Sequence, residues 1–306
     1  MKFIYSNTNK RYHTLDYYYK NKFNTKIIKV SLNAGFSCPH LKSGGCIYCS
    51  NLGSGEYAGN ITDDLITQFV KGKEMMNKKW PNGKYIGYFQ ARTNTYAPLE
   101  ILKEKYETIL NLKDVIGLSI ATRPDSISDE CLEYLSELNK KTFLTIELGL
   151  QTVHEETSKL INRGHDLKCF TDMVKKLRDK NINVVVHIIN GLPYETKEMM
   201  LETVKFLNKL DIQGIKIHML HILKNTKLEK LYNQNKFDLL TKEQYIKLVC
   251  EQLEYLRPEI VIHRLTGDPK IDDLIEPKWI TKKIDVLNGI DKYMADKNIV
   301  QGDKII

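Results

Sequence analysis

Three cysteines lie within twelve residues, at Cys38, Cys46 and Cys49, and the last two have the spacing C-x-x-C. Residues 27–34, just upstream, are mostly apolar and rich in β-branched side chains, which predicts a β-strand. The thiols are therefore expected on the loop that leaves this strand, where glycines let the chain fold back. Three thiolates can ligate one metal centre, and in a [4Fe–4S] cluster they leave one iron open to another ligand.

The same residue types fit other sites. The three cysteines and His40 could bind a tetrahedral zinc ion, because zinc accepts both thiolates and imidazole. A disulfide is less expected, since nothing in the sequence indicates secretion. The segment taken alone leaves iron–sulfur and zinc as alternatives. The remaining cysteines, Cys131, Cys169 and Cys250, are scattered in predicted helices and are expected to be inert thiols.

Composition limits the class of protein. The chain has 306 residues, 42% hydrophobic and 27% charged, which is enough for one large domain with a full core. Its net charge of +8 favours an acidic partner such as nucleic acid. No apolar run approaches the length of a membrane span, so no membrane partner is expected. Six cysteines without a signal peptide indicate a cytoplasmic protein.

Strand-like and helix-like segments alternate along the chain. After the first strand, further strands are predicted at 84–90, 115–122, 144–151, 184–189, 215–220 and 260–265, and helices at 62–79, 99–112, 128–138 and 239–256. Helices inserted between strands make the strands parallel. We therefore predict an α/β fold, a partial or complete parallel (β/α) barrel, whose chemistry lies at the carboxyl ends of the strands.

Three parts are expected along the chain. Residues 1–26 form a basic and aromatic segment, whose tyrosines either cover the barrel wall or contact nucleic acid. Residues 27–225 form the barrel core. Residues 226–306 form a small C-terminal extension that closes the barrel, in which Arg264 and Asp268 either complete the pocket or are ordinary turn residues.

Several polar residues fall in or at the ends of the predicted strands, namely Gln90, Arg123, Glu147, Gln151, His187 and His218. Glu147 lies inside an apolar strand, where a carboxylate is costly without a partner. An ion pair with Arg123 is one candidate for that partner. The two histidines could face the barrel centre, although histidines in apolar strands are more often satisfied within the core.

Taken together, these motifs resemble the radical S-adenosylmethionine (radical SAM) superfamily. Tyr48, just before the last cysteine, is similar to the aromatic residue of its cluster loop. The usual spacing is C-x3-C-x2-C, and the seven residues between the first two cysteines here resemble the YhcC-like subgroup instead. The segments 121–125 (Ala-Thr-Arg-Pro-Asp), 146–152 and 162–165 (Asn-Arg-Gly-His) resemble the radical SAM domain of the Elongator catalytic subunit in order and spacing.

The resemblance implies that the three cysteines ligate a [4Fe–4S] cluster and that SAM binds the open iron. Glu147 is similar to the carboxylate that bonds the SAM ribose, and Arg163 to the arginine that pairs with the SAM carboxylate. A solvated cation at a helix end is the alternative for Arg163. Gln90 stands where many relatives carry Gly-Gly-Glu for the SAM amino group, which is a departure from the family. Arg123 and Gln151 are expected on the substrate side.

The implied function is that of a radical enzyme. Such enzymes take one electron from a donor such as flavodoxin or ferredoxin and cleave SAM to methionine and a 5′-deoxyadenosyl radical. The Elongator-like motifs imply tRNA as the substrate, and the subgroup implies the wobble-uridine side chain, converted from carboxymethylaminomethyl to aminomethyl. Two alternatives stay open: a radical SAM enzyme acting on a protein or small metabolite, and a non-catalytic zinc- or iron–sulfur-binding protein.

Overall fold

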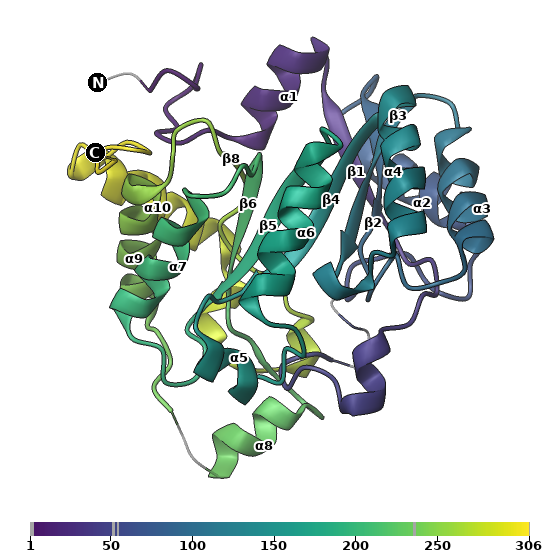
Figure 1. The fold of residues 1–306 in the computed structure, drawn as a ribbon. Helices are drawn as coiled ribbons and strands as arrows, with labels where there is room; N and C mark the ends of the chain where they lie inside the picture. Colours follow the sequence, from purple (N-terminus) through teal and green to yellow (C-terminus); the bar gives the residue numbers. More distant parts are fainter. Residues whose placement is uncertain (1–2, 51–52, 54, 235–236, 306) are drawn as a thin grey trace.

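A seven-stranded sheet forms the centre of the molecule in the computed structural model, which describes residues 3–50, 53, 55–234 and 237–305 (Figure 1). The strands are β1 (Ile27–Leu32), β2 (Lys84–Phe89), β3 (Val115–Thr122), β4 (Phe143–Gln151), β5 (Asn183–Asn190), β6 (Gly214–Met219) and β8 (Val261–Arg264). All neighbours pair in parallel, in the order β1-β2-β3-β4-β5-β6-β8. Within the described residues the edge strands β1 and β8 do not pair with each other, so the sheet is a curled half barrel. The predicted α/β fold is confirmed in its partial-barrel form.

The strands read as apolar runs because both faces of a parallel sheet are covered. Ile146 of β4 and Ile215 of β6 are fully buried. Successive side chains of a strand point to opposite faces, so the neighbouring Glu147 and Lys216 project from the other face. That face is the interior of the half barrel, and both charged residues are buried there.

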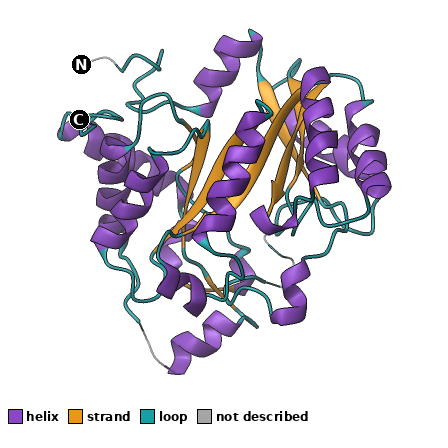
Figure 2. Cartoon of the chain, viewed as in Figure 1, coloured by secondary structure: helices purple, strands orange, loops and turns teal. Residues whose placement is uncertain are grey.

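Most helices cover the outer face of the sheet (Figure 2). The helices are α1 (Leu15–Phe23), α2 (Leu65–Asn77), α3 (Leu99–Leu110), α4 (Asp129–Lys141), α5 (Glu155–Leu160), α6 (Leu167–Asp179), α7 (Lys197–Leu207), α8 (Lys227–Gln234), α9 (Lys242–Tyr255) and α10 (Lys283–Asp296). Helix α2 begins later than predicted, because Asp64 is its N-cap and accepts a hydrogen bond from the Thr67 amide at 2.8 Å.

The N-terminal segment packs against the sheet. Helix α1 contacts β1 and β8, and the amide of Ile262 in β8 donates to the carbonyl oxygen of His13 at 2.7 Å. Tyr19 is buried and meets Phe143 edge-to-face, with ring centroids 6.2 Å apart. For Tyr19, this contact supports the prediction that tyrosines of residues 1–26 cover the barrel wall.

The chain beyond β6 continues the same sheet. Strand β8 pairs with β6, and helices α9 and α10 pack on each other beside it. A short antiparallel pair, β7 (Ile222–Leu223) with β9 (Leu274–Glu276), lies at the carboxyl end of β6. Among the described residues, no helix is both long enough and apolar enough to cross a membrane.

Candidate active site

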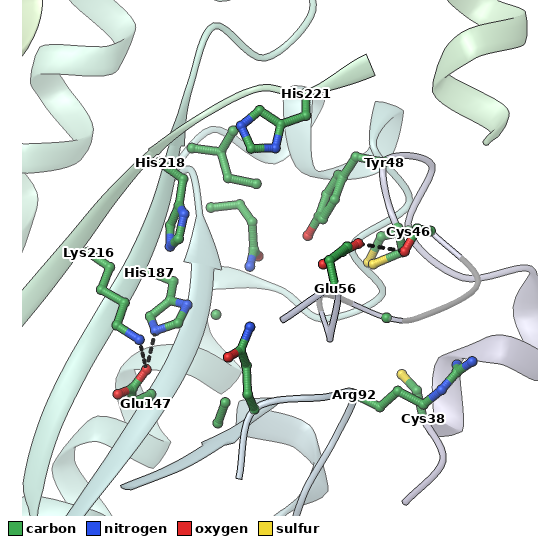
Figure 3. A pocket seen from close by; sticks show the side chains of 18 of the residues that line it. Cys38, Cys46, Tyr48, Glu56, Arg92, Glu147, His187, Lys216, His218 and His221 are labelled. Atoms are coloured by element: carbon green, nitrogen blue, oxygen red, sulfur yellow. Dashed lines mark hydrogen bonds and ion pairs between the residues drawn. The ribbon is translucent and has the colours of Figure 1, made fainter. Parts of the chain in front are cut away.

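A single cavity collects most of the residues singled out from the sequence (Figure 3). It opens at the carboxyl ends of the strands, where parallel barrels carry their chemistry. Seven predicted site residues line it, namely Cys38, Cys46, Cys49, Gln90, Arg123, Glu147 and Gln151. Arg163, the eighth, lies outside this lining.

The three thiols lie on one side of the cavity, on the loop that follows β1. All three are free, and Cys46 and Cys49 are close enough to share a hydrogen bond. That bond lowers the pKa of Cys46 to about 6 and, together with burial, raises the pKa of Cys49 well above its ordinary value. The Cys38 thiol lies apart from the Cys46 thiol (Figure 3).

This separation fits a cluster better than a single ion. Zinc requires its ligands around one point, whereas a cubane spreads its thiolates over separate irons. No three His, Cys, Asp or Glu side chains of the described ranges converge as ligands of one metal ion. Three cysteine thiols around one cavity are the donor set that a [4Fe–4S] cluster takes.

His40 has both ring nitrogens occupied by the protein. Its Nε2 donates to the carbonyl oxygen of Asn162 at 2.6 Å, and its Nδ1 accepts from the Ser43 hydroxyl at 2.6 Å. The side chain is only 9% exposed. An imidazole held in this way has no lone pair for a metal, so the geometry does not support His40 as a fourth ligand of a Cys3His zinc site.

The long spacing between the first two cysteines has a structural explanation. Residues 39–43 form a short 3-10 turn that ends at Gly44, with φ of 93°. The residues between Cys38 and Cys46 are bound to the turn that includes Gly164, since Asn162 Nδ2 donates to the Gly45 carbonyl at 2.7 Å. A Cβ on Gly164 would lie 2.5 Å from the His40 ring, so glycine permits the close approach.

Arg163 holds the same turn from within. Its guanidinium donates to the carbonyl oxygens of Leu150 at 2.7 Å, Thr152 at 2.6 Å and His165 at 2.9 Å. The residue is 1% exposed, so it is not a solvated cation at a helix end. Its pairing with the SAM carboxylate stays a prediction; Nη2 has no hydrogen-bond partner among the described residues and lies 3.7 Å from Glu155 Oε1.

Arg123 lies beside the cysteines. It forms a two-pronged ion pair with Asp125, with contacts of 2.9 and 2.7 Å, and its Nη1 donates to the Arg163 carbonyl at 2.8 Å. Its partner is therefore Asp125, not Glu147. At the end of β4, Gln151 has φ of 62°, a conformation that is uncommon outside glycine and often found at functional sites.

Glu147 is the centre of the opposite side of the cavity. Its Oε1 accepts from Lys29 Nζ at 2.9 Å and from Ser119 Oγ at 2.6 Å. Its Oε2 accepts from His187 Nε2 at 2.7 Å and from Lys216 Nζ at 2.5 Å. These donors come from β1, β3, β5 and β6, so one carboxylate in β4 connects five strands.

The charges of this network follow from burial and proximity. Burial alone would raise the pKa of Glu147, but the ammonium groups of Lys216 and Lys29 outweigh it and hold the pKa well below its ordinary value. Burial lowers the pKa of Lys216 to about 7. Burial and the nearby Lys216 lower the pKa of His187 to about 4, so the imidazole is neutral near pH 7.

The two carboxylate oxygens have four lone-pair sites, and four donors occupy them. The predicted contact between Glu147 and the SAM ribose would therefore need one of these donors to leave. Sequence reasoning did not identify Lys29, Ser119 or Lys216. The signal was present, because both lysines, like Glu147, interrupt apolar strands.

Replacing Glu147 by Gln is expected to destabilise the protein strongly, because two ammonium groups lose their counter-charge inside the barrel. Breaking a buried ion pair costs about 3–5 kcal/mol, which corresponds to a fall in melting temperature on the order of 10 °C. Glu100→Gln, in a side chain that is 82% exposed, is the control and should shift melting by less than about 2 °C.

The difference in stability between wild type and Glu147→Gln is expected to shrink when the pH is low enough to protonate Glu147. The pKa of Glu147 in the fold lies well below its ordinary value of 4.5, so its stabilisation is complete above pH 4.5 and is lost as pH falls through the folded pKa. Thermal unfolding at several pH values should show the contribution of the carboxylate disappearing as pH falls below 4.5. If Glu147→Gln lowers the melting temperature by no more than the control Glu100→Gln does, the proposed stabilising role of the Glu147 network is wrong.

Comparison with family models identifies the chain in two segments. Residues 37–207 match the radical SAM superfamily, and residues 212–296 match the radical SAM C-terminal domain. The first match contains the cysteine loop and strands β2 to β5, and the second contains β6 and β8. The two matches together span the whole half barrel beyond β1.

Individual relatives agree with this result. YtqA of Bacillus subtilis is 53% identical over 304 residues, covering 98% of this chain and 94% of the relative. YhcC of Escherichia coli K12 is 29% identical over 289 residues, covering 93% and 92% of the two chains. The solved structure of Elp3 from Methanocaldococcus infernus shares the fold, with a TM-score of 0.69 at 18% identity over 90% of this chain and 64% of that one.

The cysteine loop, the half barrel and these matches agree. The protein belongs to the radical SAM superfamily, whose enzymes use a [4Fe–4S] cluster and S-adenosylmethionine, and it is similar to YtqA and YhcC over nearly its whole length.

Proposed function

We propose that the protein acts on tRNA, converting the carboxymethylaminomethyl side chain of a wobble uridine to aminomethyl. The observation that carries the proposal is the cavity, which brings the thiols together with Arg123 and Gln151 from the Elongator-like motifs. The net charge of +8 supports a polyanionic partner. Hydrogen abstraction from the glycine-like methylene of the side chain would be the first step of this conversion.

The proposed roles divide between cofactor and substrate. Cys38, Cys46 and Cys49 would hold the cluster, and SAM would bind its open iron. When bound, cluster and SAM supply a 5′-deoxyadenosyl radical that takes a hydrogen from an unactivated C–H bond. A one-electron donor such as flavodoxin or ferredoxin would reduce the enzyme.

The remaining residues would orient the two reactants. Arg123 is fixed by Asp125 beside the thiols, so it is placed to contact a substrate that approaches the cluster. Gln90 and Gln151 line the same cavity from β2 and β4. At Gln90 the backbone could take the role that Gly-Gly-Glu has in other family members. Arg163 remains a candidate for the SAM carboxylate through its Nη2, whereas the four donors on Glu147 argue against the predicted contact of that carboxylate with the SAM ribose.

Removing any cluster ligand is expected to abolish iron binding. Cys38→Ala, Cys46→Ala and Cys49→Ala should each lose most iron and acid-labile sulfide and all SAM cleavage after anaerobic reconstitution, because two thiolates do not secure a cubane. Cys169→Ala is the matched control, since Cys169 is also partly exposed but lies on α6, and it should keep both.

His40 tests the zinc alternative in the same assay. His40→Gln should retain iron, sulfide and SAM cleavage at a level above that of the cysteine variants, because the imidazole bonds the loop rather than a metal. Full iron in Cys38→Ala would contradict the ligand assignment. Purified wild type that binds zinc and no iron under anaerobic conditions would support the non-catalytic alternative.

The substrate is tested on tRNA from a strain that lacks the gene. Anaerobic incubation with the reconstituted enzyme, SAM and reductant, followed by nucleoside mass spectrometry, should show carboxymethylaminomethyluridine replaced by aminomethyluridine. Binding of the tRNA should weaken as salt rises, because phosphate contacts release counterions. Formation of 5′-deoxyadenosine with unchanged tRNA would point instead to a protein or small-metabolite substrate.

A further inference from the structure

The barrel interior holds more positive than negative charge around Glu147. Lys29 and Lys216 both donate to this one carboxylate, and their side chains are 15% and 7% exposed. Lys216 also donates to the Tyr88 hydroxyl at 3.0 Å, a neutral partner that offsets no charge. An uncompensated charge in a low-dielectric interior is costly. When both lysines are protonated, one positive charge in this network has no counter-charge.

Two cations also share one carboxylate at the end of β8, where the side chains are more exposed, 33% for Arg264 and 41% for Lys283. The Asp268 carboxylate is shared by Arg264, whose Nη1 lies 3.2 Å from Oδ2, and by Lys283, whose Nζ lies 2.8 Å from each oxygen. Arg264 and Asp268 both line the cavity, as does Lys216. The β6–β8 wall, defined by Lys216 and Arg264, therefore carries positive charge that its own carboxylates do not neutralise.

Two histidines in this wall add a second observation. His218 and His221 line the cavity, and within the described structure their Nε2 atoms are buried without a hydrogen-bond partner. Burial lowers the pKa of His221 to about 4 and that of His218 further below its ordinary value, so both rings are neutral near pH 7. Buried polar atoms without a partner are rare in proteins, and a catalytic role or a bound group is one explanation for them.

We propose that the β6–β8 wall binds an anionic oxygen group of the substrate, a carboxylate, with Arg264 and Lys216 as the recognising residues. The proposal rests on the proposed function, in which the side chain to be shortened ends in a carboxylate. Arg264 offers the planar fork that matches a carboxylate, and Lys216 adds the buried charge. The group would neutralise the excess charge of the wall.

The β6–β8 wall lies away from the place where the SAM carboxylate is expected, so the substrate carboxylate and the SAM carboxylate would bind at different positions. Lys216, His187 and His218 lie across the cavity from Cys46 and Tyr48 (Figure 3). The SAM carboxylate is expected at the open iron, on the thiol side. A substrate carboxylate on the opposite wall would place the intervening methylene between the two sides, where a hydrogen can be taken from it.

Ligand-observed NMR on the anaerobic, reconstituted enzyme tests the site without catalysis. The probes are N-methylglycine, methylamine and inorganic phosphate, each with and without saturating SAM. N-methylglycine should bind in both conditions and methylamine should not. Arg264→Gln should weaken N-methylglycine binding by about tenfold or more, in line with the loss of a charge-assisted hydrogen bond. Lys230→Met, at an exposed position, is the control and should leave it unchanged.

Other results would overturn the proposal in distinguishable ways. Phosphate that binds where N-methylglycine does not would assign the wall to an RNA backbone phosphate. N-methylglycine displaced by SAM would assign it to the SAM carboxylate. Equal affinity of N-methylglycine for wild type and for Arg264→Gln would show that Arg264 does not bind the carboxylate. Arg264→Lys, which keeps the charge but loses the fork, should recover only part of the affinity if the variant protein is folded.

The failure of this proposal can be separated from failure of the proposed function. If tRNA is converted while Arg264→Gln retains wild-type affinity for the substrate side chain, only the anion site is wrong. If N-methylglycine binds at Arg264 while tRNA is unchanged, the site stands and the substrate is another carboxylate. In that case small carboxylates and peptides replace tRNA as candidates in the 5′-deoxyadenosine assay.

Discussion

The Glu147 carboxylate is the interaction on which the interior of the half barrel depends. It accepts four hydrogen bonds from side chains of β1, β3, β5 and β6, and no other contact described here joins as many strands. A buried carboxylate is costly alone but is stable when every lone pair is used. Because a one-residue slip of any strand would turn its donor away, the network also specifies the register of the sheet.

This network and the cysteine loop divide the cavity into two chemically different sides. The thiols occupy one side and are suited to a cluster, and Arg123, paired to Asp125, lies beside them at the point where a substrate would approach. Lysines and neutral imidazoles occupy the other and are suited to an anionic substrate. The residues between Cys38 and Cys46 lie on the thiol side. His40 binds them to the turn at Asn162, which is stabilised by the hydrogen bonds of Arg163 to backbone carbonyls. The proposed cofactor site and the proposed substrate site therefore lie on separate walls of one interior.

The sequence predicted the parts of this structure that depend on local pattern. All seven strands of the sheet were found, because apolar β-branched runs mark buried parallel strands. Helices α1, α5, α7 and α8 and the β7–β9 pair were not predicted, since most of these elements are short and leave a weak periodic signal. The predicted start of α2 is Thr62 and the observed N-cap is Asp64, because residues 62–64 are Thr-Asp-Asp and both residue types cap helices well.

Contacts between distant residues were harder to predict. The sequence shows that the Glu147 carboxylate needs a partner. It suggests Arg123 for that role, whereas the ion-pair partners in the structure are Lys29 and Lys216. Lys29 is 118 positions away in the chain, so the pairing depends on strand order and register rather than on spacing. The motif around Arg163 predicts a contact with the SAM carboxylate. It does not reveal that the guanidinium also donates to backbone carbonyl oxygens in this structure.

An anaerobic crystal structure of the reconstituted enzyme with SAM tests the central claim most directly. The account predicts that Glu147 keeps its contacts with Lys29 and Lys216 when SAM is bound, with Cys38, Cys46 and Cys49 on the cluster. A Glu147 carboxylate bonded to the ribose hydroxyls, with either lysine displaced from it, would contradict the claim that this carboxylate is an internal support of the half barrel.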